Sequence, residues 1–169
     1  MDAAELRATQ APIKDRYKSD PKAAMITLKA KGSIDNEGLT CKVETGRALA
    51  VAGLHPATGG SGLELCSGDM LLEALVACAG VTLKSVATAV DVPLRSGKVI
   101  AEGDLDFRGT LGVDKEAPVG FAEIRLKFDV DTDEPQEKLD QLLKLTERYC
   151  VVYQTIKSGP PIDVSMKRA

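Results

Sequence analysis

Residues 66–90, with the sequence CSGDMLLEALVACAGVTLKSVATAV, decide the fold that we expect. Ser67 can act as the N-cap of a helix, and Asp69 places a carboxylate in the first turn, where the helix dipole favours negative charge. The apolar residues that follow cover more than one face of such a helix: Leu71, Leu72, Leu75, Val76, Ala79, Leu83, Val86, Ala87 and Val90. We therefore predict a core helix with neighbours on several sides rather than a surface helix.

Two cysteines are the candidates for chemistry. Cys78 lies in the middle of the predicted helix between Ala77 and Ala79, whose small side chains let a substrate or another segment approach the sulfur. Cys150 lies at the end of a second helical pattern. Taken alone, these residues leave open the alternative that both are inert buried thiols. A mid-helix thiol gains little from its own helix dipole, so we expect a cation near Cys78.

Composition indicates one soluble globular domain. The chain has 169 residues, is 44% hydrophobic and carries a net charge of −3, so it can bury one sizeable core. We predict a single domain over residues 1–169, with residues 1–23 as an N-terminal arm. There is no basic face or run that would suggest nucleic-acid binding. The N-terminus resembles no signal peptide and charges interrupt the apolar runs, so we expect no membrane span and a cytoplasmic protein.

The spacing of the cysteine and histidine residues predicts no metal or cofactor site. The four cysteines, at 41, 66, 78 and 150, form no C-x-x-C pair, and His55 is the only histidine. We therefore expect no metal and no cofactor. Cys41 falls on the apolar face of a predicted strand, where a buried hydrophobic role is usual. Cys66 could face the positive end of the helix as a redox-sensitive surface thiol, but we interpret it as a loop cysteine.

The stretch HPATGGSG, residues 55–62, connects the predicted strands to the core helix. It lacks the Lys-Ser/Thr of a phosphate-binding P-loop and the G-x-G-x-x-G spacing. We predict that its glycines only let the chain turn close to the helix, and that His55 is a loop residue.

Periodicity predicts an α+β protein with antiparallel meanders and segregated helices. Residues 3–20 are interpreted as a short helical arm or an irregular segment. The order β-β-β-α-β-β-α-β follows from strands at 25–31, 39–44 and 49–53, the core helix, strands at 98–108 and 121–130, a helix from about Pro135 through Cys150 to about Lys157, and a last strand at 162–166.

These segments resemble the OsmC/Ohr family, the osmotically inducible and organic hydroperoxide resistance proteins. SGDMLLEALVACAGVTL is similar to the signature P-x-E-L-L-L-A-A-L-A-A-C-x-x-M-T-L, and HPATGGSG to the preceding Pro-x-x-x-Gly-Gly loop. LLKLTERYCVVYQTI resembles the second-cysteine segment, in which Cys-Pro-x-x-x-Thr-Leu is usual. The likeness covers residues 25–166 and includes the order of the elements.

The resemblance implies an OsmC-like fold with a buried central helix, in an intertwined homodimer with two sites at the subunit interface. Cys78 would then be the peroxidatic residue that attacks an organic hydroperoxide. Cys150 would resolve the resulting sulfenic acid as a disulfide, and a small dithiol or lipoyl-type reductant would recycle it. The alternative is a non-catalytic OsmC-like protein that binds an apolar small molecule at the dimer interface.

Three departures from the family pattern point to the OsmC-like branch. Active members carry a Glu at the start of the core helix, where this chain has Asp69, or Gly68 in a register one residue earlier. Their Arg in the N-terminal sheet has no matching motif here, although Lys42 and Arg47 lie in that region. Val151 replaces the usual proline after the second cysteine. The positions that match the family's catalytic residues are Cys78, Cys150 and Asp69, and we predict that these three form the catalytic set.

Overall fold

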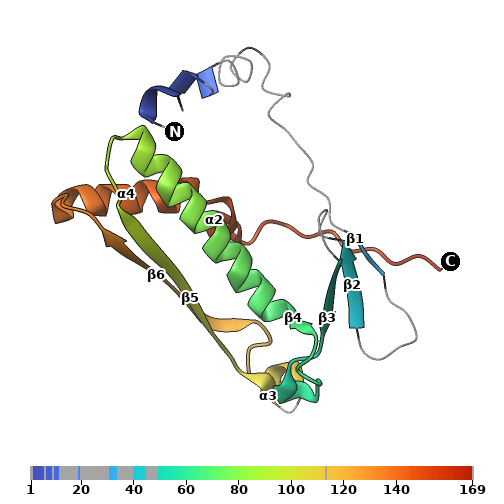
Figure 1. The fold of residues 1–169 in the computed structure, drawn as a ribbon. Helices are drawn as coiled ribbons and strands as arrows, with labels where there is room; N and C mark the ends of the chain where they lie inside the picture. The colour runs from blue at the N-terminus through green and yellow to red at the C-terminus, as the bar shows by residue number, and fades with distance from the viewer. Residues whose placement is uncertain are drawn as a thin grey trace.

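The computed structural model describes residues 2–5, 7–8, 10–11, 19, 31–33, 40–44, 49–112 and 114–168, and of residues 31–33, 40–44 and 49 it describes the backbone. A long helix, α2, lies along a two-stranded sheet, with two further helices beside it and a small separate sheet near its N-terminal end (Figure 1). The described residues within 3–11 are helical, which is one of the two alternatives expected for the arm.

Helix α2 (Ser67–Ala89) is the central element. The N-cap residue is Cys66 rather than the predicted Ser67, and the Cys66 side chain makes no capping hydrogen bond. Asp69 does lie in the first turn. The buried residues form a single stripe at every fourth position: Leu75, Ala79, Leu83 and Ala87.

The described part of the single chain therefore covers only one side of α2, which differs from the expected burial on several sides. Much of the rest is open, and Val81 is 72% exposed. In the described part of the chain, α2 is also the one helix that is long and apolar enough to cross a membrane. This is weak evidence for a span, because the core helix of a soluble protein meets the same criterion.

Strands β5 (Ser96–Leu105) and β6 (Phe121–Asp131) form an antiparallel hairpin. Their apolar positions face the same way in register, with Val99 opposite Phe128 and Ala101 opposite Leu126. Cross-strand ion pairs occupy the other positions, where Arg125 contacts Asp104 and Glu102, and Lys127 contacts Glu102. The hairpin thus presents an apolar face to α2 and a charged face to solvent.

Strand β5 ends earlier than the predicted residue 108 because a short helix, α3 (Phe107–Thr110), follows it. The side chain of Asp106 accepts a hydrogen bond from the N–H of Arg108 and so caps this helix. Such local capping competes with continuation of the strand.

Helices α4 (Gln136–Tyr149) and α5 (Val151–Ser158) close the core. Leu142 of α4 packs with Leu83, Ala87 and Val92, and the partly buried side chains around this cluster are Val86, Leu94, Phe128 and Val130. Cys150 interrupts the helical run in an extended conformation, with φ −74° and ψ 106°, and is both the C-cap of α4 and the N-cap of α5. The break redirects the chain so that the start of α5 meets α2.

The second sheet has the order β1-β2-β3-β4, from β1 (Lys31–Ser33), β2 (Thr40–Glu44), β3 (Leu49–Gly53) and β4 (Leu65–Cys66). The predicted meander is confirmed for its described part, because β1–β2 and β2–β3 are antiparallel. The short β4, which was not predicted, pairs with β3 in parallel. Residues 25–30 of the first predicted strand lie outside the described residues, as does the side chain of Cys41.

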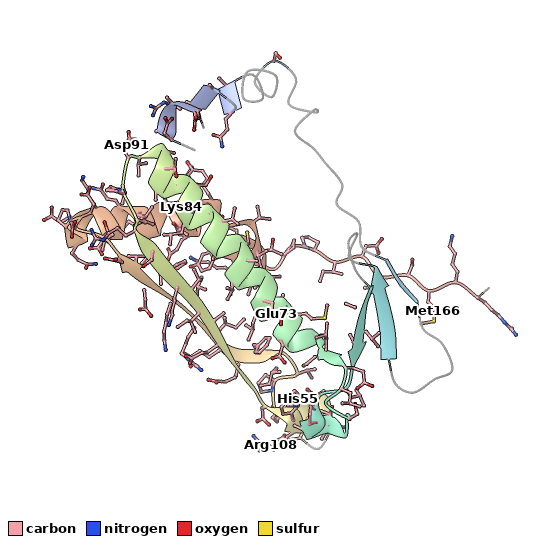
Figure 2. The ribbon with its side chains drawn as sticks, in the orientation of Figure 1. His55, Glu73, Lys84, Asp91, Arg108 and Met166 are labelled. Atoms are coloured by element: carbon pink, nitrogen blue, oxygen red, sulfur yellow. The ribbon has the colours of Figure 1, made fainter. Side chains whose placement is uncertain are left out.

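The Gly-rich loop contains a 3-10 turn, η2 (Pro56–Thr58), and its close contact is with the end of the preceding strand segment rather than with the core helix. A Cβ atom at Gly60 would lie 1.6 Å from the carbonyl oxygen of Leu54, so only glycine fits there. His55 and Arg108 lie at this end of the molecule and Asp91 at the other (Figure 2).

The predicted last strand is not formed in the single chain. Residues 159–168 have no regular secondary structure, and Ile162, Val164 and Met166 are almost fully exposed. This segment leaves the helices and runs to the C-terminus, where Met166 stands apart from them (Figures 1 and 2). The alternation is present, but a strand also needs a hydrogen-bonding neighbour, and none of the described strands provides one.

Candidate functional site

The fold brings Cys78 and Cys150 into contact. Cys78 is half-buried on α2, and Cys150, at the break between α4 and α5, is 1% exposed. Both are free thiols, and a hydrogen bond joins their side chains. Two residues far apart in the sequence therefore form one thiol pair at the contact of three helices.

The surroundings of Cys78 favour its thiolate. Burial raises the pKa of Cys78, but hydrogen bonds from the N–H of Val152, the Cys150 thiol, the Thr82 hydroxyl and the N–H of Val151 outweigh it, and the net pKa is lowered. The donors from the main chain belong to the first turn of α5, whose dipole also favours an anion. Among the described residues, the start of a neighbouring helix supplies donors to this sulfur, and the expected cation stays a prediction.

The pKa of Cys150 moves the other way. Burial raises it, and the adjacent Cys78 sulfur raises it further, against hydrogen bonds from the N–H groups of Tyr153 and Val152. Cys78 therefore ionises first, and Cys150 stays protonated as its hydrogen-bond donor. This polarity suits a nucleophile paired with a second thiol.

A cavity of about 740 Å³ opens beside Cys150, between α2, β6, α4 and α5. Its lining is mainly apolar, and Cys150 forms part of the wall. A smaller cavity of about 490 Å³ reaches Cys150 from the other side of the helix break. Volumes of this size are typical of small-molecule sites.

Residues 59–165 match the protein family described as OsmC-like protein. The chain belongs to this family. The match spans more than half of the chain, including both cysteines and the whole of α2, and it confirms the resemblance found in the sequence. Among curated proteins, none matches the chain.

Solved structures of the OsmC-like family share the fold. An OsmC-like protein from Mycoplasma pneumoniae has a TM-score of 0.65 at 13% identity, covering 79% of this chain and 89% of that one. An organic hydroperoxide resistance protein OsmC from Legionella pneumophila gives 0.61 at 16%, covering 79% and 91%. An organic hydroperoxide resistance protein from Elizabethkingia anophelis gives 0.62 at 14%, covering 80% and 91%. At these identities the likeness establishes the predicted α+β, OsmC-like fold.

The structure does not bring Asp69 to the thiol pair within one protomer. Position 78 lies nine residues beyond position 69 on the same helix. This separation places Asp69 about 14 Å along the axis from Cys78 and about half a turn round it. Any role of Asp69 beside Cys78 would need a partner protomer and stays a prediction.

The other residues considered from the sequence lie elsewhere. Cys66 is half-buried at the N-terminus of α2, and its sulfur lies with Leu105 and Phe121 around Gly68. The Nδ1 atom of His55 accepts a hydrogen bond from the N–H of Ala57 at 3.0 Å, and its ring stacks on Phe107. His55 fits the loop role expected for it, whereas Cys66 was expected in a loop and instead ends strand β4 and caps α2. Arg47 and the side chain of Lys42 lie outside the described residues.

Sequence reasoning missed three groups at the site: the Thr82 hydroxyl and the N–H groups of Val151 and Val152. Thr82 could have been found, because it lies one helical turn after Cys78 on the same face. The main-chain donors could not, since their contact with Cys78 depends on the direction in which α5 leaves Cys150.

Proposed function

We propose that this OsmC-like protein is a thiol-dependent peroxidase that reduces organic hydroperoxides through Cys78 and Cys150. The observation that carries the proposal is the polarised thiol pair, in which Cys78 is stabilised as the thiolate and hydrogen-bonded to a protonated Cys150. Hydroperoxide resistance also appears in the names of two structural relatives.

In the proposed cycle, the Cys78 thiolate attacks the terminal oxygen of the hydroperoxide. The S–O bond forms, the O–O bond breaks, and the alkoxide takes a proton and leaves as the alcohol. Cys150 then attacks the sulfur of the sulfenic acid, the disulfide forms, and water leaves. A small dithiol reduces the disulfide and is itself oxidised to its disulfide.

The large cavity supports an apolar organic substrate rather than hydrogen peroxide. Side chains such as Leu83, Leu126 and Leu139 line it, and burying an alkyl group against them is favourable by about 25 cal/mol per Å². We further propose that the protein is a cytoplasmic homodimer. The broad exposed side of α2 supports this assembly.

A cumene hydroperoxide consumption assay with dithiothreitol or dihydrolipoamide tests the proposed activity. We expect turnover by the wild type and none by Cys78→Ser, whereas Cys66→Ser should match the wild type. If the reduced and folded wild-type protein shows no turnover, this result would contradict the proposed peroxidase activity.

The same cavity supports a second candidate, a non-catalytic protein that binds an apolar small molecule. Cys150 lines the cavity whereas Cys78 does not, so a ligand could be held without meeting the proposed nucleophile. This candidate predicts that an apolar fluorescent probe binds equally well to the wild type and to Cys78→Ser, with no hydroperoxide turnover.

A further inference from the structure

The start of α5 presents main-chain donors that the helix itself cannot use. The N–H of Gln154 donates to the carbonyl oxygen of Cys150 at 2.9 Å, which is the first bond of the helical ladder. The N–H groups of the three preceding residues, Val151, Val152 and Tyr153, therefore have no acceptor within α5. The N-cap residue is a cysteine and offers no hydroxyl, amide or carboxylate oxygen to them.

Sulfur atoms take the place of that oxygen. Val151 directs its N–H group to Cys78, Val152 shares its N–H between Cys78 and Cys150, and Tyr153 directs its N–H to Cys150. The two cysteines thus cap α5 from two different segments of the chain, and Cys78 receives its donors from the first two helical positions.

The side chain of Val151 has little to do with this contact, because the residue is 69% exposed. Its relevant property is that it has a main-chain N–H at the first position of the helix, which is a position where proline is readily accommodated and would supply none. The backbone of Cys150, at φ −74° and ψ 106°, is also close to the conformation required before a proline.

We propose that Val151 is a positioning residue of the active site, whose main-chain N–H adds a donor to Cys78 and holds the negative charge there rather than on Cys150. The proposal rests on the proposed function for its catalytic meaning, but the charge on Cys78 can be measured without any peroxidase assay.

The charged side chains described near Cys78 do not contact its sulfur, so its thiolate is stabilised by uncharged donors, among them those of α5. Cys150 is the titratable side chain in contact with it. The nearest charged residues of α2, Glu73 and Lys84, project about 120–140° round the helix from Cys78 and are exposed. Arg148 of α4 and Lys157 of α5 instead lie over the rings of Tyr149 and Tyr153.

Val151→Pro removes the N–H, and Val151→Ala is the matched control that keeps it. Iodoacetamide alkylation of the reduced full-length protein, followed across pH by peptide mass spectrometry of Cys78, reports the thiolate. We expect the Val151→Pro midpoint to rise, with about a twofold loss of thiolate at low pH, because the Val151 hydrogen bond is the weakest of those that lower the pKa of Cys78. Val151→Ala should follow the wild type.

Equal profiles for wild type and Val151→Pro, with unchanged circular dichroism, would overturn the proposal, as would equal shifts in both variants. A hydroperoxidase assay on the same samples is a separate readout. An inactive protein with the predicted alkylation shift would reject the proposed function and keep the role of Val151.

If Val151→Pro does not fold, a second measurement tests whether the main-chain N–H of Val151 donates to Cys78. In the ¹⁵N-labelled wild type, the Val151 amide proton should titrate with the same midpoint as Cys78 alkylation, and the titration should disappear in Cys78→Ser. A Val151 amide that stays unchanged through that midpoint would overturn the proposal.

Discussion

The thiol of Cys150 hydrogen-bonds to the sulfur of Cys78 although the two residues belong to different helical segments. Cys78 is fixed by the packed stripe of α2, and Cys150 by its burial at the break between α4 and α5. The same break that places Cys150 also directs the first N–H groups of α5 at Cys78. One local feature therefore creates both the partner thiol and the donors that polarise the pair.

Cys150→Ser should separate the two proposed oxidation steps. Without the second thiol, the sulfenic acid formed on Cys78 has no partner in contact to condense with, so it should persist after one equivalent of cumene hydroperoxide. Dimedone labelling followed by mass spectrometry measures it. We expect strong labelling of Cys78 in Cys150→Ser and weak labelling in the wild type. Equal labelling of the two proteins would remove the resolving role of Cys150.

Thr82→Val should weaken the Cys78 thiolate while keeping the shape of the side chain. The lost hydroxyl is one of the hydrogen-bond donors that lower the pKa of Cys78, so that pKa should rise towards its usual value. As pH falls, the thiolate and its reactivity should then be lost earlier than in the wild type. We expect about a threefold slower alkylation near pH 7. Thr82→Ser keeps the hydroxyl and should behave like the wild type; a slow Thr82→Ser would indicate a packing effect instead.

Reduction of the disulfide should begin at Cys150. Both cavities reach this residue, whereas Cys78 lines neither. Cys78 also has the lower pKa of the pair, which makes it the better leaving group in thiol–disulfide exchange. Brief treatment of the oxidised protein with 2-mercaptoethanol, an acid quench and peptide mapping should find the mixed disulfide on Cys150. An adduct found mainly on Cys78 would show that the reductant enters elsewhere.

Leu142→Ala should destabilise the fold far more than Leu143→Ala. Leu142 is 2% exposed and belongs to the cluster with Leu83 and Ala87, whereas its neighbour is 41% exposed. Loss of a buried leucine side chain costs about 2–5 kcal/mol, and a change at the exposed position less than about 1 kcal/mol. Urea unfolding followed by circular dichroism measures both. Similar losses would place the core elsewhere.

Periodicity predicts the long elements that pack against each other within one chain, but not the short strand β4 or helix α3. Helical spacing of apolar residues 71–90 predicts α2, and alternation predicts the β5–β6 hairpin, because one face of each is buried against the other. Alternation at Ile162, Val164 and Met166 predicted a strand that the single chain does not form. A pattern of side chains specifies a face but not the neighbour that the face requires.

The candidate site was predictable in part for the same reason. Sequence and resemblance singled out Cys78 and Cys150, which the fold brings together, and Asp69, which it leaves on another side of α2. The N–H groups of Val151 and Val152 carry no side-chain signal, so no motif could reveal them. Their role arises from the orientation of α5 after the extended backbone of Cys150.

Val81→Asp should prevent dimer formation without disturbing the protomer. Val81 is 72% exposed and lies on the side of α2 that also carries the exposed, small residues Ala74 and Ala77. Small side chains let two helices approach closely, so this side suits a second copy of α2, and a carboxylate buried there without a partner would be costly. We expect sedimentation velocity to find a wild-type dimer and a folded Val81→Asp monomer. Lys115→Asp, at an exposed position in the connection between β5 and β6 and away from α2, is the control and should remain dimeric. A wild type that is monomeric at micromolar concentration, or a dimer that survives Val81→Asp, would show that this side of α2 is not the interface.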